Sequence, residues 1–202
     1  MRIGIDFDNT IVSYDQLFHK VAVERDVVPS NTAASKLAVR DYLRSVDKES
    51  IWTEMQGYVY GARMDEAASY PGVVEFIRDT GAAGHTITIV SHKTKFPFLG
   101  PQYDLHAAAR SWVGHHLCVD GRPLMPREQV FFELTKEEKL ARIGTLGCDV
   151  FIDDLPEIFQ AAAFPRGTRR ILFDPEAHHG TMAVDQAVVC KSWAEVKAVL
   201  NS

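Results

Sequence analysis

The chain has 202 residues, 46% of them apolar, which is enough to build one substantial hydrophobic core. Its net charge of −5 argues against a nucleic-acid-binding module, because such modules gather Lys and Arg on one surface. No run approaches the roughly 18 to 20 uncharged residues of a membrane span, and no secretory signal is recognisable. Together with three widely spaced cysteines, this predicts a cytoplasmic protein without a disulfide framework.

The first segment predicts a buried strand that ends in acidic residues. Residues 2–5 form a short, largely apolar run, and Asp6 and Asp8 follow at once. Because a sheet interior does not tolerate unpaired carboxylates, the carboxyl end of this strand is expected to open into a site. From residue 13 to residue 69 the apolar residues recur at helical spacing, which predicts an all-helical insert.

The rest of the chain alternates between strand and helix patterns. Strands are expected over residues 86–90, 130–132, 148–152 and 170–173, and helices over residues 73–78, 105–117, 135–146 and 193–200, with a further helix after Pro156. Thr135 and Glu138 have the spacing of a capping box at the start of one of these helices. The alternation predicts an α/β fold, with a Rossmann-like, mostly parallel sheet and helices on both faces.

Polar residues follow three of the predicted strands. The first strand leads to Asp6 and Asp8, the second to Ser91, and a later one to Asp153 and Asp154. Since the carboxyl ends of parallel strands meet at one edge of a sheet, these groups should gather there. Clustered carboxylates repel one another unless a cation is present, and hard oxygen ligands favour Mg²⁺. The sequence therefore predicts a magnesium site at this edge.

Four motifs occur in order on these predicted elements. They are IDFDNT at residues 5–10, IVS at residues 89–91, a lysine at 136 or 139, and FIDD at residues 151–154. Together they closely resemble the four motifs of the haloacid dehalogenase (HAD) superfamily. The stretch YPGV at residues 70–73 resembles that family's return from cap to core, and the resemblance extends from residue 2 to about residue 173.

The resemblance implies a Mg²⁺-dependent phosphatase that forms an aspartyl-phosphate intermediate. Asp6 would be the nucleophile and a metal ligand. Asp8 would protonate the leaving oxygen and then activate water, while its backbone carbonyl reaches the metal. An Asp at this second position favours a phosphatase over the superfamily's dehalogenases, which lack a general acid there. Ser91 would hydrogen-bond the phosphoryl group, and Asp153 and Asp154 would complete the metal site directly or through water.

Two lysines compete for the remaining motif. Lys136 lies at the start of its predicted helix, whereas Lys139 precedes the apolar Leu140 and lies 14 residues before Asp153. We favour Lys139 as the cation that stabilises the transferring group. The other lysine is then expected on a solvated helix face.

Basic residues also follow Ser91 directly. His92, Lys93 and Lys95 would lie near the mouth of the site, where they either touch substrate phosphate or merely make the loop polar. The paired histidines at 115–116 and 178–179 are read as surface or core residues, because adjacent side chains point to different sides of an element.

The resemblance also divides the chain into domains. It places an α/β core over residues 1–12 and 70–202 and a small helical cap over residues 13–69. Such a cap excludes water and contacts the substrate. The expected partner is a small phosphorylated metabolite, with neither a nucleic acid nor a membrane. A 5′-nucleotidase-like enzyme, a nucleic-acid 3′-phosphatase and a catalytically silent binding module are the alternatives, and the oligomeric state stays open.

Overall fold

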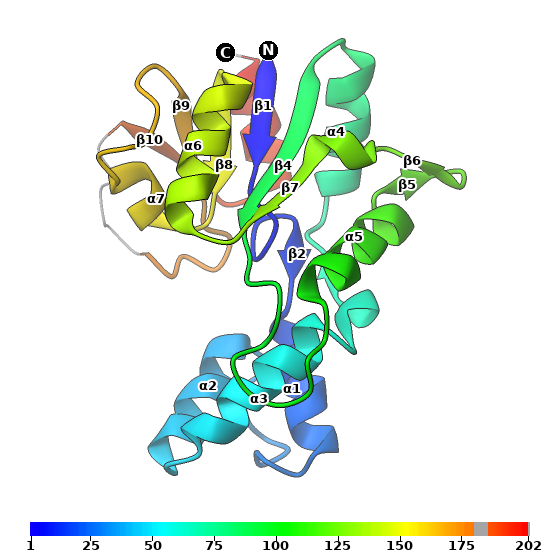
Figure 1. Ribbon diagram of the computed structural model, residues 1–202, viewed down its shortest axis with the longest axis vertical. Helices are drawn as coiled ribbons and strands as arrows, with labels where there is room; N and C mark the ends of the chain where they lie inside the picture. The colour runs from blue at the N-terminus through cyan, green and yellow to red at the C-terminus, as the bar shows by residue number, and fades with distance from the viewer. Residues whose placement is uncertain (180–185, 202) are drawn as a thin grey trace. The chain divides into compact units, whose positions relative to one another are not determined.

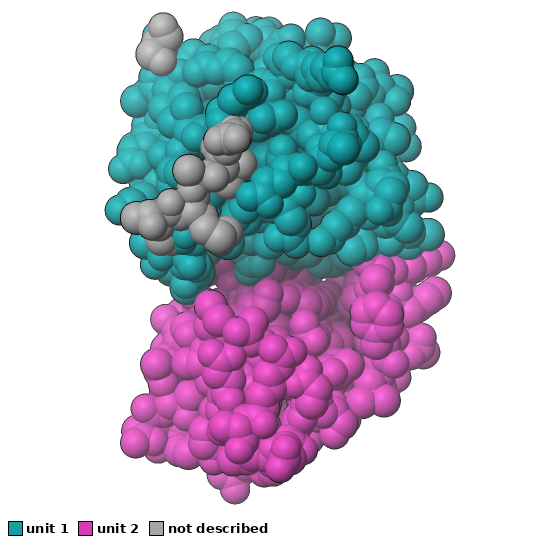
Figure 2. All heavy atoms as spheres, turned by 90° about the vertical axis from the view of Figure 1, so that its left-hand side faces the viewer, with its two compact units in different colours: residues 1–12, 69–93, 117–202 teal, residues 13–68, 94–116 magenta. Residues whose placement is uncertain are grey.

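The computed structural model describes residues 1–179 and 186–201 of the chain (Figure 1). The residues cluster into two compact units, which Figure 2 colours separately. Residues 1–12, 69–93 and 117–202 form the first, called here the α/β unit. Residues 13–68 and 94–116 form the second, called the helical unit.

A parallel sheet forms the centre of the α/β unit. Within the described part of the chain it has six strands in the order β10-β9-β8-β1-β4-β7. Their bounds are β1 Arg2–Ile5, β4 Thr86–His92, β7 Val130–Glu133, β8 Val150–Asp153, β9 Arg169–Phe173 and β10 Ala187–Cys190. Every neighbouring pair runs parallel, as predicted. The described residues also contain two separate two-stranded sheets, β2 (Val12–Ser13) with β3 (Ala68–Ser69) and β5 (Cys118–Val119) with β6 (Arg122–Pro123).

Helices cover both faces of this sheet (Figure 1). Their bounds are α4 Val73–Ala82, α6 Lys136–Leu146, α7 Pro156–Gln160 and α8 Trp193–Leu200. Two adjacent residues of β9 illustrate this, because successive side chains of a strand point to opposite faces of the sheet. Leu172 belongs to the apolar cluster beneath α6 and α7, whereas Phe173 packs 5.3 Å from the Trp193 ring of α8. The prediction of an α/β fold with helices on both faces is confirmed.

The helical unit has its own aromatic core. Its elements are α1 Asp15–Glu24, α2 Lys36–Ser45, α3 Glu49–Tyr60, the short 3-10 helix η1 Met64–Glu66, and α5 Leu105–His116. The ring of Phe18 packs 5.0 Å from Trp52, and that of Tyr14 packs 4.9 Å from Tyr60. Of the helices in residues 1–179 and 186–201, none is long and apolar enough for a membrane span.

One segment clusters differently from the expected domain division. Residues 94–116 belong to the helical unit, whereas the family resemblance predicts them in the α/β core. The reason is close packing at two glycines, Gly57 within α3 and Gly61 at its C-terminal end. A Cβ added at Gly57 would lie 2.6 Å from Pro97, and one added at Gly61 would lie 2.4 Å from Tyr103, so the loop before α5 packs directly against this helix. The indole of Trp112 also donates a 2.8 Å hydrogen bond to the Ala67 carbonyl.

Most predicted elements occur within a few residues of their expected bounds. The capping box at Thr135 and Glu138 is present, and α8 spans the expected residues. β10, however, was not predicted. It is an edge strand in which Val188 and Val189 are exposed and Cys190 is buried, so it lacks the continuous burial of the central strands.

A glycine in β1 permits close packing between two central strands. A Cβ added at Gly4 would lie 2.5 Å from the Phe151 ring of β8 and 3.0 Å from the Cys148 sulfur. We expect Gly4→Ala to destabilise the protein by about 1 to 3 kcal/mol, because a buried ring would have to shift. Urea denaturation measures the loss. Gly81→Ala is the matched control, since a Cβ there meets no atom within 4 Å, and an equal effect of both substitutions would contradict this packing.

Candidate active site

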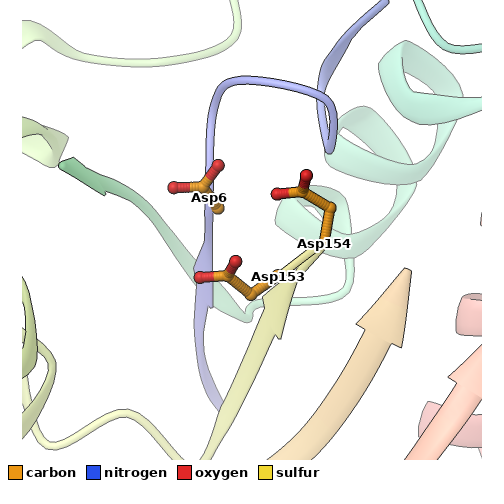
Figure 3. A group of neighbouring side chains, drawn as sticks. All are labelled: Asp6, Asp153 and Asp154. Atoms are coloured by element: carbon orange, nitrogen blue, oxygen red, sulfur yellow. The ribbon is translucent and has the colours of Figure 1, made fainter. Parts of the chain in front are cut away.

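The register of the central strands places the acidic residues side by side. Ile5 of β1 pairs with Ile152 of β8, and the Asp6 amide donates a 2.9 Å hydrogen bond to the Ile152 carbonyl. Asp6 and Asp153 therefore leave the sheet at the same edge. One carboxylate oxygen of each of Asp6, Asp153 and Asp154 lies within 4.8 Å of the others. Figure 3 shows these side chains at the ends of β1 and β8.

A tight turn after β1 places the second acidic residue of the first motif. The amides of Ile11 and Val12 both donate to the Phe7 carbonyl, at 3.1 Å each. Asn9 has a left-handed backbone with φ of 58°, a conformation that Asn adopts more readily than most residues. The turn brings Asp8 into the same pocket as Asp6.

Helix α6 supplies a buried cation to the acidic cluster. The Lys139 ammonium lies 2.6 Å from Asp6 Oδ1 and 2.6 Å from Asp153 Oδ2, and its side chain is 2% exposed. Lys139 is one helical turn from Ile143, so it lies on the helix face that packs on the sheet. Of the two lysines considered from the sequence, Lys139 is the one that contacts the carboxylates.

Lys136 lines the same pocket but has a different partner. Its ammonium lies 2.8 Å from Glu157 of α7, and its side chain is 45% exposed. This is a surface ion pair, of the kind that usually adds little to stability.

The electrostatics of the cluster suit a divalent cation. Burial raises the pKa of the Asp6 carboxyl to about 7, although the Lys139 ammonium opposes this shift. Burial acts to lower the pKa of Lys139, but the carboxylates of Asp153 and Asp6 outweigh it and raise the pKa overall. Three carboxylates beside one ammonium leave two negative charges when all are ionised. Their oxygens are hard ligands of the type that Mg²⁺ prefers, so the residues present fit this ion.

The remaining predicted site residues line a small pocket at this edge. Its volume is about 70 Å³, and its lining includes Asp6, Asp8, Asn9, Ser91, His92, Lys136, Lys139, Asp154, Leu155 and Ile158. Ser91 is buried in β4, while His92 is partly buried. Burial and the charge of Lys139 lower the pKa of His92, which favours the neutral ring as a hydrogen-bonding group. Asp153, which is fully buried, is not among the residues that line this pocket.

The structure brings two further polar residues, Lys93 and His179, to the acidic residues of the site. From the sequence, the role of Lys93 stayed open and His179 was expected to be a surface or core residue. The Lys93 ammonium lies 2.7 Å from Asp8 Oδ2, so its partner is a carboxylate of the site. The His179 ring nitrogen Nε2 lies 2.8 Å from the Asp154 carbonyl oxygen. The sequence signal for Lys93 was its position two residues after Ser91, whereas His179 lies too far along the chain from Asp154 for any local pattern to connect them.

Comparison with known structures identifies the fold. No protein-family model and no curated protein matches the sequence. A phosphoserine phosphohydrolase-like protein from Francisella tularensis subsp. tularensis SCHU S4 has a similar structure, with 15% identity, a TM-score of 0.60, and coverage of 98% of this chain and 99% of that one. The fold is that of the HAD superfamily.

Two further structures show the range of chemistry found on this fold. A HAD family hydrolase from Deinococcus radiodurans R1, solved with bound phosphate and sodium, is 18% identical at a TM-score of 0.54 and covers 98% of this chain and 94% of that one. An L-2-haloacid dehalogenase is 9% identical at a TM-score of 0.57 and covers 100% of this chain and 98% of that one. These neighbours include both a hydrolase solved with phosphate and a dehalogenase, so the shared fold alone does not choose between these chemistries.

Proposed function

We propose that the protein is a Mg²⁺-dependent phosphomonoester hydrolase that acts through an aspartyl-phosphate intermediate on Asp6. One observation carries this choice: Asp8, a group able to give and take a proton, lines the same pocket as Asp6. Hydrolysis of a phosphomonoester needs a proton on the leaving oxygen, whereas a halide leaves without one. The pair of carboxylates therefore favours a phosphatase over a dehalogenase.

The first half of the reaction transfers the phosphoryl group to the enzyme. A carboxylate oxygen of Asp6 attacks phosphorus, and the bond from phosphorus to the leaving oxygen breaks. Asp8 gives its proton to that oxygen, so the product leaves as an alcohol. The Lys139 ammonium, already 2.6 Å from Asp6, lies where it stabilises the negative charge of the transferring group.

The second half releases the phosphate. Asp8, now a carboxylate, takes a proton from water, whose oxygen attacks the phosphorus of the intermediate. The bond from phosphorus to Asp6 breaks, which restores the Asp6 carboxylate and forms inorganic phosphate. Ser91 and His92 are the groups we assign to hydrogen bonds with the phosphoryl oxygens, because both line the pocket.

Asp6, Asp153 and Asp154 are the side chains we assign to the metal, with the backbone carbonyl of Asp8 as a further ligand. When bound, Mg²⁺ supplies positive charge beside the transferring phosphoryl group. We propose a cytoplasmic reaction on a small phosphorylated metabolite. No disulfide joins Cys118, Cys148 or Cys190, which all lie in the described part of the chain, and this suits a reducing compartment. We propose the helical unit as the cap.

Removal of the metal should abolish activity. We expect hydrolysis of 4-nitrophenyl phosphate to disappear with excess chelator and to return when Mg²⁺ is added, since the clustered carboxylates then recover their counter-ion. The measurement is the steady-state rate of nitrophenol release. A calcium-saturated chelator is the control for effects of the chelator itself. Full activity in excess chelator would contradict the metal assignment.

A substrate panel then tests the reaction class. Sugar phosphates, nucleoside monophosphates, a 3′-phosphorylated oligonucleotide and a 2-haloacid are incubated with the Mg²⁺-loaded protein, and phosphate or halide release is measured. We expect phosphate release from at least one small phosphomonoester. Halide release without phosphate release would show a dehalogenase, and activity confined to the oligonucleotide would show a nucleic-acid phosphatase.

A further inference from the structure

A buried lysine outside the four motifs contacts the proposed acid and base. The Lys93 ammonium lies 2.9 Å from Asp8 Oδ1 and 2.7 Å from Asp8 Oδ2. The side chain of Lys93 is only 4% exposed, while that of Asp8 is 23% exposed. One ammonium thus contacts both oxygens of the carboxylate. Such a contact restricts rotation of the carboxylate more than a hydrogen bond to a single oxygen would.

The lysine is itself held by its neighbours. Its backbone amide donates a 2.8 Å hydrogen bond to the Glu133 carbonyl, which continues the pairing of β4 with β7. Its ammonium lies 5.6 Å from the centre of the Phe7 ring, and that ring packs edge-on against Phe132 at 5.3 Å. Strand pairing therefore holds the Lys93 backbone, and its ammonium contacts the Asp8 carboxylate beside the buried Phe7 ring.

Asp8 lies on a turn and not on a strand of the central sheet. Asp6 and Asp153 are bound by a shared lysine and lie next to strand pairing, whereas Asp8 lies on the turn beyond β1. Proton transfer requires the carboxylate within hydrogen-bond reach of the reacting oxygen. A displacement of about 1 Å in a reacting group lowers a rate by roughly 100-fold.

We propose that Lys93 is a positioning residue, which holds the Asp8 carboxylate in place to take a proton from water in the second half of the reaction. This inference rests on the proposed function, since it gives Asp8 the role of acid and base. Lys93 acts through Asp8 and not on the phosphoryl group, so its effect on catalysis depends on the carboxylate at position 8.

A double-mutant cycle tests that dependence. Lys93→Met keeps the length of the side chain and removes its charge. In the presence of Asp8 we expect it to lower kcat on an alkyl phosphate roughly 10- to 100-fold, with KM changed far less. In the Asp8→Asn background, where the carboxylate is already absent, the same substitution should change kcat by less than about threefold. Lys93→Arg, which keeps the charge, should recover part of the loss.

The controls separate positioning from general stability. Lys197→Met removes a lysine that pairs with Asp79 on the surface at 2.8 Å, and it should leave kcat unchanged. If Lys93→Met lowers kcat by the same factor in both backgrounds, the lysine acts independently of Asp8 and the inference is wrong.

A crystal structure of the Lys93→Met protein provides a test that does not depend on activity. We expect the Asp8 carboxylate to leave its wild-type position while Asp6 and Asp153 keep theirs. An unmoved Asp8 would overturn the inference even if the enzyme is a phosphatase. Absence of phosphatase activity in the wild-type protein would instead refute the proposed function, and the position of Asp8 in the variant would still decide whether Lys93 holds it.

Discussion

Asp6→Asn should abolish turnover. The substitution replaces the proposed nucleophile with an amide of nearly the same shape, so the pocket is retained while the attacking oxygen is lost. We expect kcat for phosphomonoester hydrolysis to fall by on the order of 10⁴-fold or more, as when other covalent nucleophiles are removed. No phosphorylated protein should form. The measurements are steady-state hydrolysis and the phosphate content of acid-quenched protein.

Asp8→Asn is the matched variant for this experiment, because it makes the same chemical change two residues away. It should slow the proton-dependent steps but keep binding of inorganic phosphate, measured as competitive inhibition, near the wild-type value. With 4-nitrophenyl phosphate, whose leaving group needs little help from an acid, the Asp8→Asn protein should still release an initial burst of nitrophenol. Near wild-type turnover by Asp6→Asn would exclude a covalent intermediate on this residue.

Loss of Lys139 should have the second largest effect. Lys139→Ala removes a buried ammonium that lies 2.6 Å from both Asp6 and Asp153, so negative charge in the transition state loses a fixed counter-charge. We expect kcat and kcat/KM to fall together by on the order of 10²- to 10³-fold. Breaking this buried pair should also reduce the free energy of unfolding by about 3 to 5 kcal/mol, measured by denaturation in chelator.

Lys136→Ala is the control, since it removes the same side chain one helical turn away. Lys136 pairs with Glu157 at the surface, so we expect a change of only a few-fold in rate and little change in stability. Lys139→Met, which retains most of the buried volume, separates loss of charge from loss of packing. If Lys136→Ala lowered kcat strongly and Lys139→Ala did not, Lys136 and not Lys139 would be the lysine that stabilises the phosphoryl group. If both variants were near wild type, neither lysine would stabilise the phosphoryl group.

The arrangement of the acidic cluster was predictable from strand ends alone. An apolar run that stops at a carboxylate marks the carboxyl end of a buried strand, and parallel pairing brings such ends together. This reasoning predicts that Asp6 and Asp153 lie side by side, which the structure shows. The burial of Lys139 is consistent with the apolar Leu140 that follows it in the sequence, whereas Lys136 at the start of α6 is exposed.

Other features depend on packing between distant segments and leave no local pattern. Residues 94–116 join the helical unit because Gly57 lets Pro97 approach α3, and neither residue alone indicates that contact. The Lys93 contact with Asp8 depends on the direction of one side chain in the turn after β1. His179 reaches the Asp154 carbonyl only because β8 and β9 are neighbours in the sheet. These contacts follow from the three-dimensional arrangement and not from residue spacing.

Peptide mapping of acid-quenched protein tests the central claim most directly. The Mg²⁺-loaded enzyme is mixed with a hydrolysable phosphomonoester, quenched in acid within the first turnover, digested, and analysed by mass spectrometry. We predict a phosphoryl group on Asp6, found in the wild-type and Asp8→Asn proteins and absent from Asp6→Asn. A phosphoryl group on another residue, or hydrolysis of the substrate without any phosphorylated peptide, would contradict catalysis through Asp6.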